Sequence, residues 1–166
     1  MKPKKARSRA SLAQVSAHAP ESLITYRVSV LAQVLSRLVD ASVRDTLGLT
    51  SRQWRVLVIL NRLGTSSSGE VARTANYDHS QVSRVTSELV EKGVITQVSD
   101  PGDRRKQLLA LTPAGIDLLR NGLPGSLERE ARLRSRLSDG EYEVFIRALK
   151  VLEDEALELL GEVKPR

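Results

Sequence analysis

The sequence has 166 residues, a formal net charge of +6 and a pI of about 10.0. This length suits one domain, with or without extensions, and the basic surplus favours an acidic partner such as nucleic acid or an anionic surface. The absence of cysteine excludes disulfide bonds, thiol redox sensing and cysteine-ligated zinc. His18 and His79 are the only histidines, too few for a histidine-rich metal cluster, so we expect neither a metal nor a cofactor.

The longest apolar run, Val56 to Leu60, is far too short to cross a bilayer. The N-terminus is basic but lacks the apolar segment of a secretory signal. We therefore expect a cytoplasmic protein with no membrane partner. Residues 1–20 form a basic arm, interpreted either as a flexible solvated tail or as an arm that touches DNA phosphates or a partner subunit. The five cations of this arm are Lys2, Lys4, Lys5, Arg7 and Arg9.

Two helices are predicted before residue 65. The first covers about residues 22–46 and ends at Gly48. Its apolar residues recur at steps of three and four: Ile24, Val28, Leu31, Leu35 and Leu38. Thr50 is the expected cap of a second helix over residues 51–63, which ends at Gly64. Trp54, Leu57, Val58 and Ile59 are the apolar members of this second helix.

The pattern of a helix-turn-helix follows. After a polar connection at residues 66–68, Ser68 is predicted to cap a short helix that runs to Ala75. Asn76 suits the left-handed conformation of a tight turn, and Asp78 with Gln81 forms a capping-box pair that opens a longer helix. Val82, Val85 and Leu89 are its expected buried stripe, and Gly93 ends it.

The outward face of the longer helix is polar and carries short donors and acceptors with one arginine. Its residues are His79, Ser80, Gln81, Ser83, Arg84 and Ser87. Any surface helix has a polar face, but these side chains also suit the major groove of DNA, where Gln can pair with adenine and Arg with guanine. Ser80, Gln81, Ser83 and Arg84 are therefore the predicted base-reading residues.

A β-hairpin is predicted directly after this helix. Residues 94–99 and 107–111 read as strands, joined through the turn at 100–103. Arg104 and Arg105 then lie at the hairpin tip with nothing apolar beside them. This order of elements is that of a winged helix, and the two arginines are placed to reach the DNA backbone or a narrow minor groove.

The last third of the chain is predicted to be helical. A helix begins at Pro113, is interrupted around residues 122–125 by a kink or break at Pro124, and resumes to about Arg136. Ser138 and Glu141 form a capping box for a final helix to about residue 161. Its apolar stripe consists of Tyr142, Phe145, Leu149, Leu152, Ala156, Leu159 and Leu160. The stripe packs either inside the monomer or, as favoured here, in a homodimer with the first helix and its symmetry mate.

The segments SGEVARTANYDHSQVSRVTSELVEKGVI and DPGDRRKQLLALTPAG resemble the DNA-binding core of the MarR family of bacterial winged helix-turn-helix regulators. The most specific part is the wing, with Asp103, Arg105, Leu111, Thr112 and Gly115 in order. The resemblance extends from about residue 22 to near the end of the chain. Asn76 stands where the family often has glycine, and His79 where it often has proline.

The resemblance implies a mainly α fold with a small β-hairpin wing, divided into a winged helix-turn-helix DNA-binding lobe at 49–112 and a helical dimerisation lobe at 21–48 and 113–163. It also implies that Asp103 orients Arg105, which enters the minor groove, while Arg104 is expected on phosphate. Such proteins are dimers that repress promoters and usually release DNA when a small aromatic acid or phenol binds. The missing cysteine argues against peroxide sensing, and two histidines argue against zinc sensing.

A further expectation concerns the effector. In the resembled family the first two helices line a pocket, and here they carry Tyr26 and Arg27, and Trp54 and Arg55. An aromatic ring beside a guanidinium can receive an aromatic carboxylate. The alternative is that Trp54 is only a core anchor and that the two arginines pair with surface acids.

Two other function classes are alternatives. An enzyme is disfavoured because the sequence has no nucleophile elbow, P-loop or metal-ligand spacing. The contiguous Asp78, His79 and Ser80 cannot form a catalytic relay at a helix start. A winged-helix module that binds protein without reading DNA is the remaining alternative, and the wing arginines with Gln81 and Arg84 favour DNA. The prediction is a sequence-specific, homodimeric repressor of a pseudo-palindromic operator.

Overall fold

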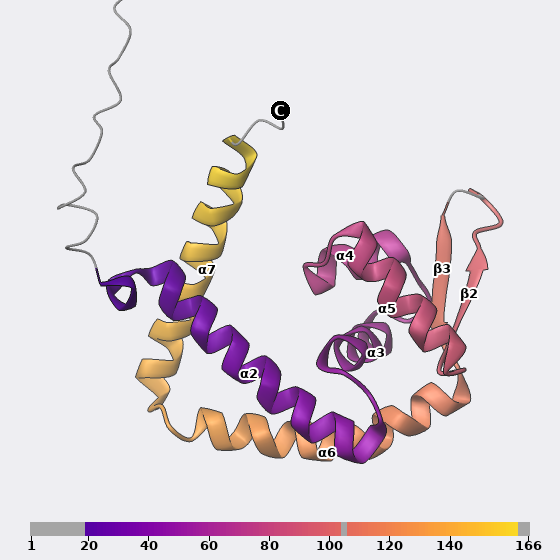
Figure 1. Cartoon of the computed structure of the whole chain (residues 1–166), viewed down its shortest axis with the longest axis horizontal. Helices are drawn as coiled ribbons and strands as arrows, with labels where there is room; N and C mark the ends of the chain where they lie inside the picture. The colour runs from indigo at the N-terminus through magenta and orange to yellow at the C-terminus, as the bar shows by residue number, and fades with distance from the viewer. Residues whose placement is uncertain (1–18, 104–105, 163–166) are drawn as a thin grey trace, which may run out of the picture. The chain divides into compact units, whose positions relative to one another are not determined.

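The computed structural model describes residues 19–103 and 106–162. Most of the predicted basic arm and the wing-tip residues Arg104 and Arg105 therefore lie outside the described residues. The chain forms two compact units, one ending at Ile116 and the other beginning at Asp117. In chain order (Figure 1), the elements are η1 (Pro20–Ser22), α2 (Ile24–Leu47), α3 (Ser51–Leu63), β1 (Ser66–Ser67), α4 (Ser68–Ala75), α5 (His79–Glu91), β2 (Ile95–Ser99), β3 (Gln107–Leu111), α6 (Pro113–Arg134) and α7 (Asp139–Glu162). The mainly α fold class with a small β wing is confirmed.

The caps predicted for the first two long helices are present. Gly48 ends α2 in the left-handed conformation, with φ 64°, and its N–H donates to the carbonyl of Arg44. Thr50 and Gln53 form a full capping box at the start of α3. Asp40 of α2 also accepts a hydrogen bond from the N–H of Ser51, so a carboxylate occupies the positive end of α3. These local bonds fix the corner between the two helices.

The connection after α3 differs from the prediction. Ser66 and Ser67 form the short strand β1, which pairs with Leu109 and Leu108 of β3. Ser67, and not Ser68, caps α4, because its backbone is extended and its hydroxyl accepts the N–H of Glu70. A strand of two residues is too short to show the alternation of apolar and polar residues that marks a strand. The segment was therefore predicted to be a polar linker.

The sheet has the order β1-β3-β2, with both pairs antiparallel. In the hairpin, Ile95 pairs with Leu111 and Ser99 with Gln107. In Figure 1 this hairpin stands beside α5, within the first unit. The first strand begins one residue later than predicted, and the second has the predicted bounds.

The core of the first unit is built from the predicted apolar faces of its helices and from the sheet. Its most deeply buried side chains are Leu49, Val56, Leu57, Leu60, Val71, Leu89, Ile95 and Leu109. The predicted stripe of α5, Val82, Val85 and Leu89, is buried throughout. Asn76 has φ 54°, the only non-glycine residue with positive φ among those described, and it ends α4 as expected. The short turn between α4 and α5 is therefore that of a helix-turn-helix.

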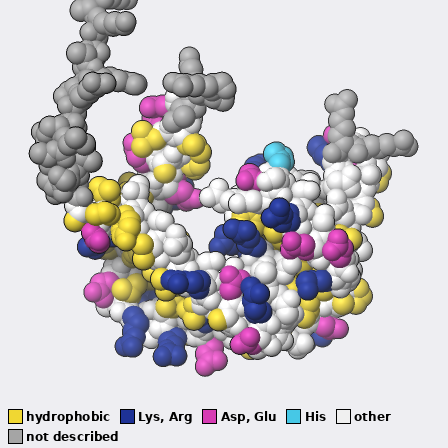
Figure 2. Space-filling model, viewed as in Figure 1, with side chains coloured by type: hydrophobic (Ala, Val, Ile, Leu, Met, Phe, Trp, Pro, Cys, Tyr) yellow, Lys and Arg dark blue, Asp and Glu magenta, His cyan; other side chains and the backbone are white. Residues whose placement is uncertain are grey.

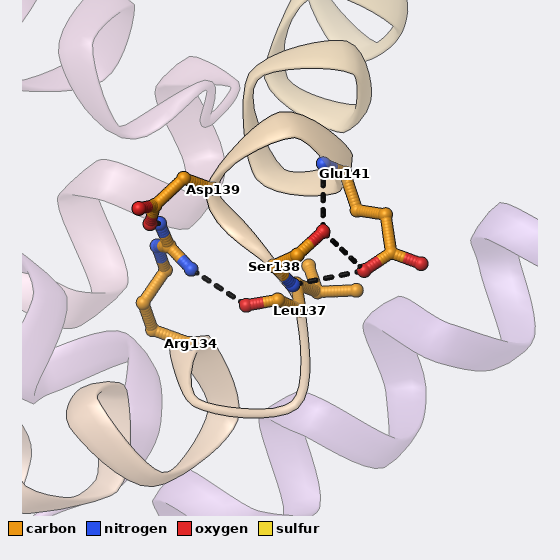
Figure 3. Close-up of polar contacts among 5 residues, drawn as sticks. All are labelled: Arg134, Leu137, Ser138, Asp139 and Glu141. Carbon is orange, nitrogen blue, oxygen red and sulfur yellow. Dashed lines mark hydrogen bonds and ion pairs between the residues drawn. The ribbon is translucent and has the colours of Figure 1, made fainter.

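The predicted break around Pro124, in the second unit, is wrong: α6 is continuous from Pro113 to Arg134, with Pro124 inside it. Proline has a φ in the helical range and removes only one i→i−4 hydrogen bond, so the flanking turns carry the helix past it. The capping box before α7 is confirmed. Figure 3 shows Ser138 donating its N–H to Glu141 (2.8 Å) while the N–H of Glu141 donates to the Ser138 hydroxyl (3.4 Å).

The bend between α6 and α7 is held by Arg134. Its guanidinium donates to the carbonyl of Leu137 (2.8 Å) and pairs with Asp139 (Figure 3). The Arg134 Cζ also lies 4.2 Å from the centre of the Tyr142 ring, a cation–π distance. In contrast, no side chain of α7 is buried, and the apolar residues of α2 are also largely exposed. In the described part of the chain, no helix has the length and apolar character needed to span a membrane.

Candidate nucleic-acid interface

The N-terminus of α5 is closed by a reciprocal set of hydrogen bonds. The N–H of Gln81 donates to Asp78 Oδ1 (2.8 Å), and the N–H of Asp78 donates to Gln81 Oε1 (3.1 Å). The hydroxyl of Ser80 also donates to Asp78 Oδ1 (2.8 Å). These bonds from Gln81 and Ser80 hold the pKa of Asp78 below its ordinary value, so the cap is a carboxylate at neutral pH.

The face of α5 opposite the buried stripe is accessible. Ser80, Ser83 and Arg84 are exposed, and Gln81 is half-buried. Arg84 forms no salt bridge or hydrogen bond within residues 19–103 and 106–162, so its guanidinium is available to an outside anion or base. The predicted reading residues therefore share one end and one side of the same helix. Figure 2 shows that Lys and Arg side chains are interspersed with acidic ones on the face in view, and do not form one continuous patch.

Two contacts that sequence analysis did not predict hold α5 in place. Gln53 of α3 is only 4% exposed, and its Nε2 donates to Glu88 Oε2 at 2.8 Å. Lys92, just after α5, donates its Nζ to the carbonyl of Gly48 at 3.3 Å. The capping-box position of Gln53 was readable in the sequence, but its partner lies 35 residues away and leaves no local signal.

The base of the wing is a tight junction. The hydroxyl of Thr112 donates to the carbonyl of Gly93 (2.8 Å) and accepts the N–H of Gly115 (3.1 Å). The N–H of Thr112 donates to the carbonyl of Val94. A Cβ at Gly115 would lie 2.1 Å from that Val94 oxygen, so only glycine fits there. The Thr and Gly of the predicted wing motif thus join the end of α5, the end of β3 and the start of α6.

The turn that leads to the wing tip is internally bonded. Asp100 accepts the N–H of Gly102 (2.7 Å), and the N–H of Asp100 donates to the carbonyl of Lys106 (2.9 Å). Asp103 Oδ2 lies 3.7 Å from the Nζ of Lys106. This ion pair was not predicted. It places the cation of Lys106 beside Asp103, the residue predicted to orient Arg105.

The four residues predicted to receive an effector do not form one cluster. Tyr26 is exposed, and Arg27 donates its Nε to the carbonyl of Glu21 (2.7 Å) on the segment before α2. Trp54 is only 5% exposed and belongs to the core. Arg55 lies elsewhere on α3, with its Cζ 5.7 Å from the centre of the Tyr77 ring. Arg55 borders a cavity.

That cavity lies between α3 and the end of α4 and has a volume of about 510 Å³. Arg55, Val58, Ile59, Arg62, Thr74, Ala75 and Asn76 line it. It combines an apolar floor with two guanidiniums, and it adjoins the turn that precedes α5. Burial raises the pKa of the neighbouring Tyr77, an effect that the charge of Arg55 opposes, so the phenol is neutral at ordinary pH. Of the residues around this cavity, Arg55 was predicted from the sequence, and Arg62 and Tyr77 were not.

The described residues contain no group of three or more His, Cys, Asp or Glu side chains able to hold a metal ion. The geometry is instead that of a helix-turn-helix followed by a wing, and comparisons with known proteins agree. The sequence pattern of the MarR family matches residues 47–106. The solved PcaV transcriptional regulator of Streptomyces coelicolor, in complex with its natural ligand, has the same fold, with a TM-score of 0.75 and 24% identity over 84% of this chain and 97% of that one.

Two relatives extend the likeness in sequence. A protein named as a transcriptional regulatory protein for the hcr operon of Thauera aromatica is 33% identical over 112 residues, 67% of this chain and 67% of the relative. The uncharacterized HTH-type transcriptional regulator YxaD of Bacillus subtilis strain 168 is 30% identical over 126 residues, 76% of this chain and 87% of the relative. With its winged helix and these relatives, the chain belongs to the MarR family of transcriptional regulators, which are not enzymes.

Proposed function

We propose that this protein represses transcription by binding a pseudo-palindromic DNA operator as a homodimer. The observation that carries the proposal is the exposed polar face of α5, whose Arg84 has no partner among the described residues, on a helix bonded to α3. Such a helix can enter the major groove with its side chains already in place. A DNA-binding regulator works where the chromosome is, so the proposed location is the cytoplasm.

The proposed contacts divide by groove. Arg84 reads base edges in the major groove together with Ser80, Gln81 and Ser83. Arg105, oriented by Asp103, enters the minor groove, and Arg104 binds phosphate.

The dimer is proposed to form through residues 21–48 and 113–163, while residues 49–112 bind DNA. Its support is the exposed apolar surface of α2 and α7, where Leu31, Leu38, Phe145, Leu149 and Leu152 are all more than a third exposed. Large exposed apolar patches mark interaction surfaces. Two-fold symmetry then places the half-sites roughly one turn of DNA, about 10 bp, apart.

Release by a small aromatic carboxylate or phenol is the finer part of the proposal. Of the predicted contacts Tyr26, Arg27, Trp54 and Arg55, the proposal now rests on Arg55, which lines the cavity. An aromatic acid can lay its ring on the apolar floor and direct its carboxylate at the guanidinium of Arg55 or Arg62. To cause release, the effector must bind the free dimer more tightly than the DNA-bound one.

The test is a gel shift of the dimer on the promoter of its own gene at several salt concentrations. We expect binding that weakens as salt rises. Arg84→Ala should cost about 1–3 kcal/mol and relax specificity. Arg105→Ala should abolish tight binding while the dimer stays intact.

The matched control is Arg136→Ala, which removes the same charge from an exposed position in the second unit and should bind like the parent. Equal binding by the parent and Arg84→Ala would remove α5 as the reader. If the parent binds no DNA at any salt concentration, the protein-interaction alternative takes the place of this proposal.

A further inference from the structure

The capping box of α5 uses the only acceptor that the Gln81 side chain has. Asp78 presents an N–H, which needs an acceptor, so the Gln81 carbonyl oxygen must face it, at 3.1 Å. Within the described part of the chain, the Gln81 Nε2 has no hydrogen-bond partner. A capped Gln81 therefore offers a groove two free amide hydrogens, whereas its oxygen is already engaged by the N–H of Asp78.

Ser80, in contrast to Gln81, is left with an acceptor, because the cap residue Asp78 also engages its side chain. A hydroxyl has one hydrogen, and Ser80 donates it to Asp78 Oδ1 at 2.8 Å. What remains on the Ser80 oxygen is acceptor capacity. Arg84, one turn along the helix from Ser80, has only donors. The polarity of the reading face is thus set inside the protein by Asp78, before any DNA is bound.

These polarities select among base edges. A glutamine that reads adenine does so through two bonds, one of which needs its oxygen to accept from N6. Guanine shows two acceptors, O6 and N7, and its partner cytosine shows the N4 donor. We propose that Gln81 is a specificity-determining residue that reads guanine of a G·C pair through Nε2 alone, while Ser80 accepts from cytosine N4. This inference rests on the proposed DNA-binding function.

Reading adenine in the two-bond manner needs the Gln81 oxygen as well, so that oxygen must either serve adenine and the N–H of Asp78 together or leave the cap. If it left the cap, the N–H of Asp78 would lose its partner at the start of α5. Reading guanine leaves every bond of the box in place. Residue type alone suggests that Gln81 pairs with adenine. Because of the capping box, we expect it to pair with guanine instead.

The experiment is selection of bound duplexes from a randomised pool by the full-length dimer, comparing the parent with Gln81→Glu. Glutamate keeps an oxygen for the N–H of Asp78, so the cap survives, but its second oxygen can only accept. At the position that responds to the substitution, we expect the parent to prefer guanine by about tenfold or more and Gln81→Glu to prefer cytosine on the same strand.

Ser87→Ala, farther along the exposed side of α5, is the control and should leave that position unchanged. Circular dichroism of Gln81→Glu should show an intact helix content. A parent that prefers adenine at the responding position, or an unchanged guanine preference in Gln81→Glu, overturns the inference while the DNA-binding function stands. Failure of the parent to select any duplex overturns both.

Discussion

Gln53 and Glu88 are joined by a partly buried hydrogen bond, 2.8 Å from Nε2 to Oε2, that ties α3 to the recognition helix α5. The Gln53 oxygen is already used, because it accepts the N–H of Thr50 in the capping box. Removal of the Glu88 carboxylate would leave a buried amide donor without a partner.

Glu88→Ala should therefore lower the free energy of unfolding by about 1–3 kcal/mol. Urea denaturation followed by circular dichroism measures it. Glu88→Gln retains an acceptor oxygen and should lose much less. Equal stabilities for the parent and both variants would show that the bond contributes nothing.

A second prediction concerns the base of the wing, where Gly115 lies close to the carbonyl oxygen of Val94. Gly115→Ala places a Cβ 2.1 Å from the Val94 oxygen and should destabilise the fold by about 1–3 kcal/mol through overpacking. Gly125→Ala is a matched control in the same helix, since a Cβ there meets nothing within 4 Å. That control should be neutral or stabilising by roughly 0.5–1 kcal/mol. Thermal melts that rank the two variants the other way would contradict the prediction.

A charge on the apolar face of α7 should dissociate the proposed dimer. Leu152 is 38% exposed in the single chain, so Leu152→Glu removes no packing from a monomer core. In a dimer interface the same carboxylate would be buried without a partner, which is costly. Light scattering at micromolar concentration should give a monomer for Leu152→Glu and a dimer for the parent. Glu153→Lys, at the neighbouring position, should remain dimeric. A parent that is itself a monomer would end the proposal.

The effector cavity can be tested through Trp54, the only tryptophan of the chain. Its emission should change saturably when benzoate or cinnamate binds near Arg55, and a parallel gel shift should show release of DNA. Arg55→Gln should weaken both signals, because the carboxylate loses its bidentate partner. A fluorescence change without DNA release would mean binding without regulation. If neither acid changes either signal, the effector proposal falls and DNA binding stands.

The cap of α7 should make part of the stability depend on pH. Hydrogen bonds from the hydroxyl and N–H of Ser138 hold the pKa of Glu141 below its ordinary value of 4.5. Because the folded chain releases this proton more readily than the unfolded chain, the stabilisation is complete above about pH 4.5. It is lost as pH falls through the folded pKa. Glu141→Gln cannot titrate, so its melting temperature should approach that of the parent as the solution is acidified below pH 4.5. A constant difference over that range would contradict the linkage.

The local signals in the sequence were sufficient for most of the fold. The capping boxes at Thr50, Asp78 and Ser138 each lie within four residues, and each is present in the structure. Pro124 led to a wrong prediction of a break in α6, because the effect of a proline on a helix depends on the neighbouring turns. The composition of residues 122–125 does not show whether those turns are stable.

The candidate site was less fully predictable. The polar face of α5 follows from helical periodicity, but its fixation depends on Gln53 and Glu88, which are 35 residues apart. Gln81 was predicted separately as a cap and as a base reader, and only the bond to Asp78 shows that the first role restricts the second. Arg62 and Tyr77 became candidates through the tertiary arrangement of α3 with α4 and the turn after it.

Ser67 belongs to two structures at once. Its backbone pairs with Leu108 in the wing strand β3, and its hydroxyl caps the first helix of the helix-turn-helix. At the other end of β3, Thr112 is bonded to Gly93, directly behind the recognition helix. These contacts tie the wing strands and α5 to each other within one protomer. If the proposed dimer forms, an operator whose half-sites are spaced differently would have to be met by rotation of one protomer against the other.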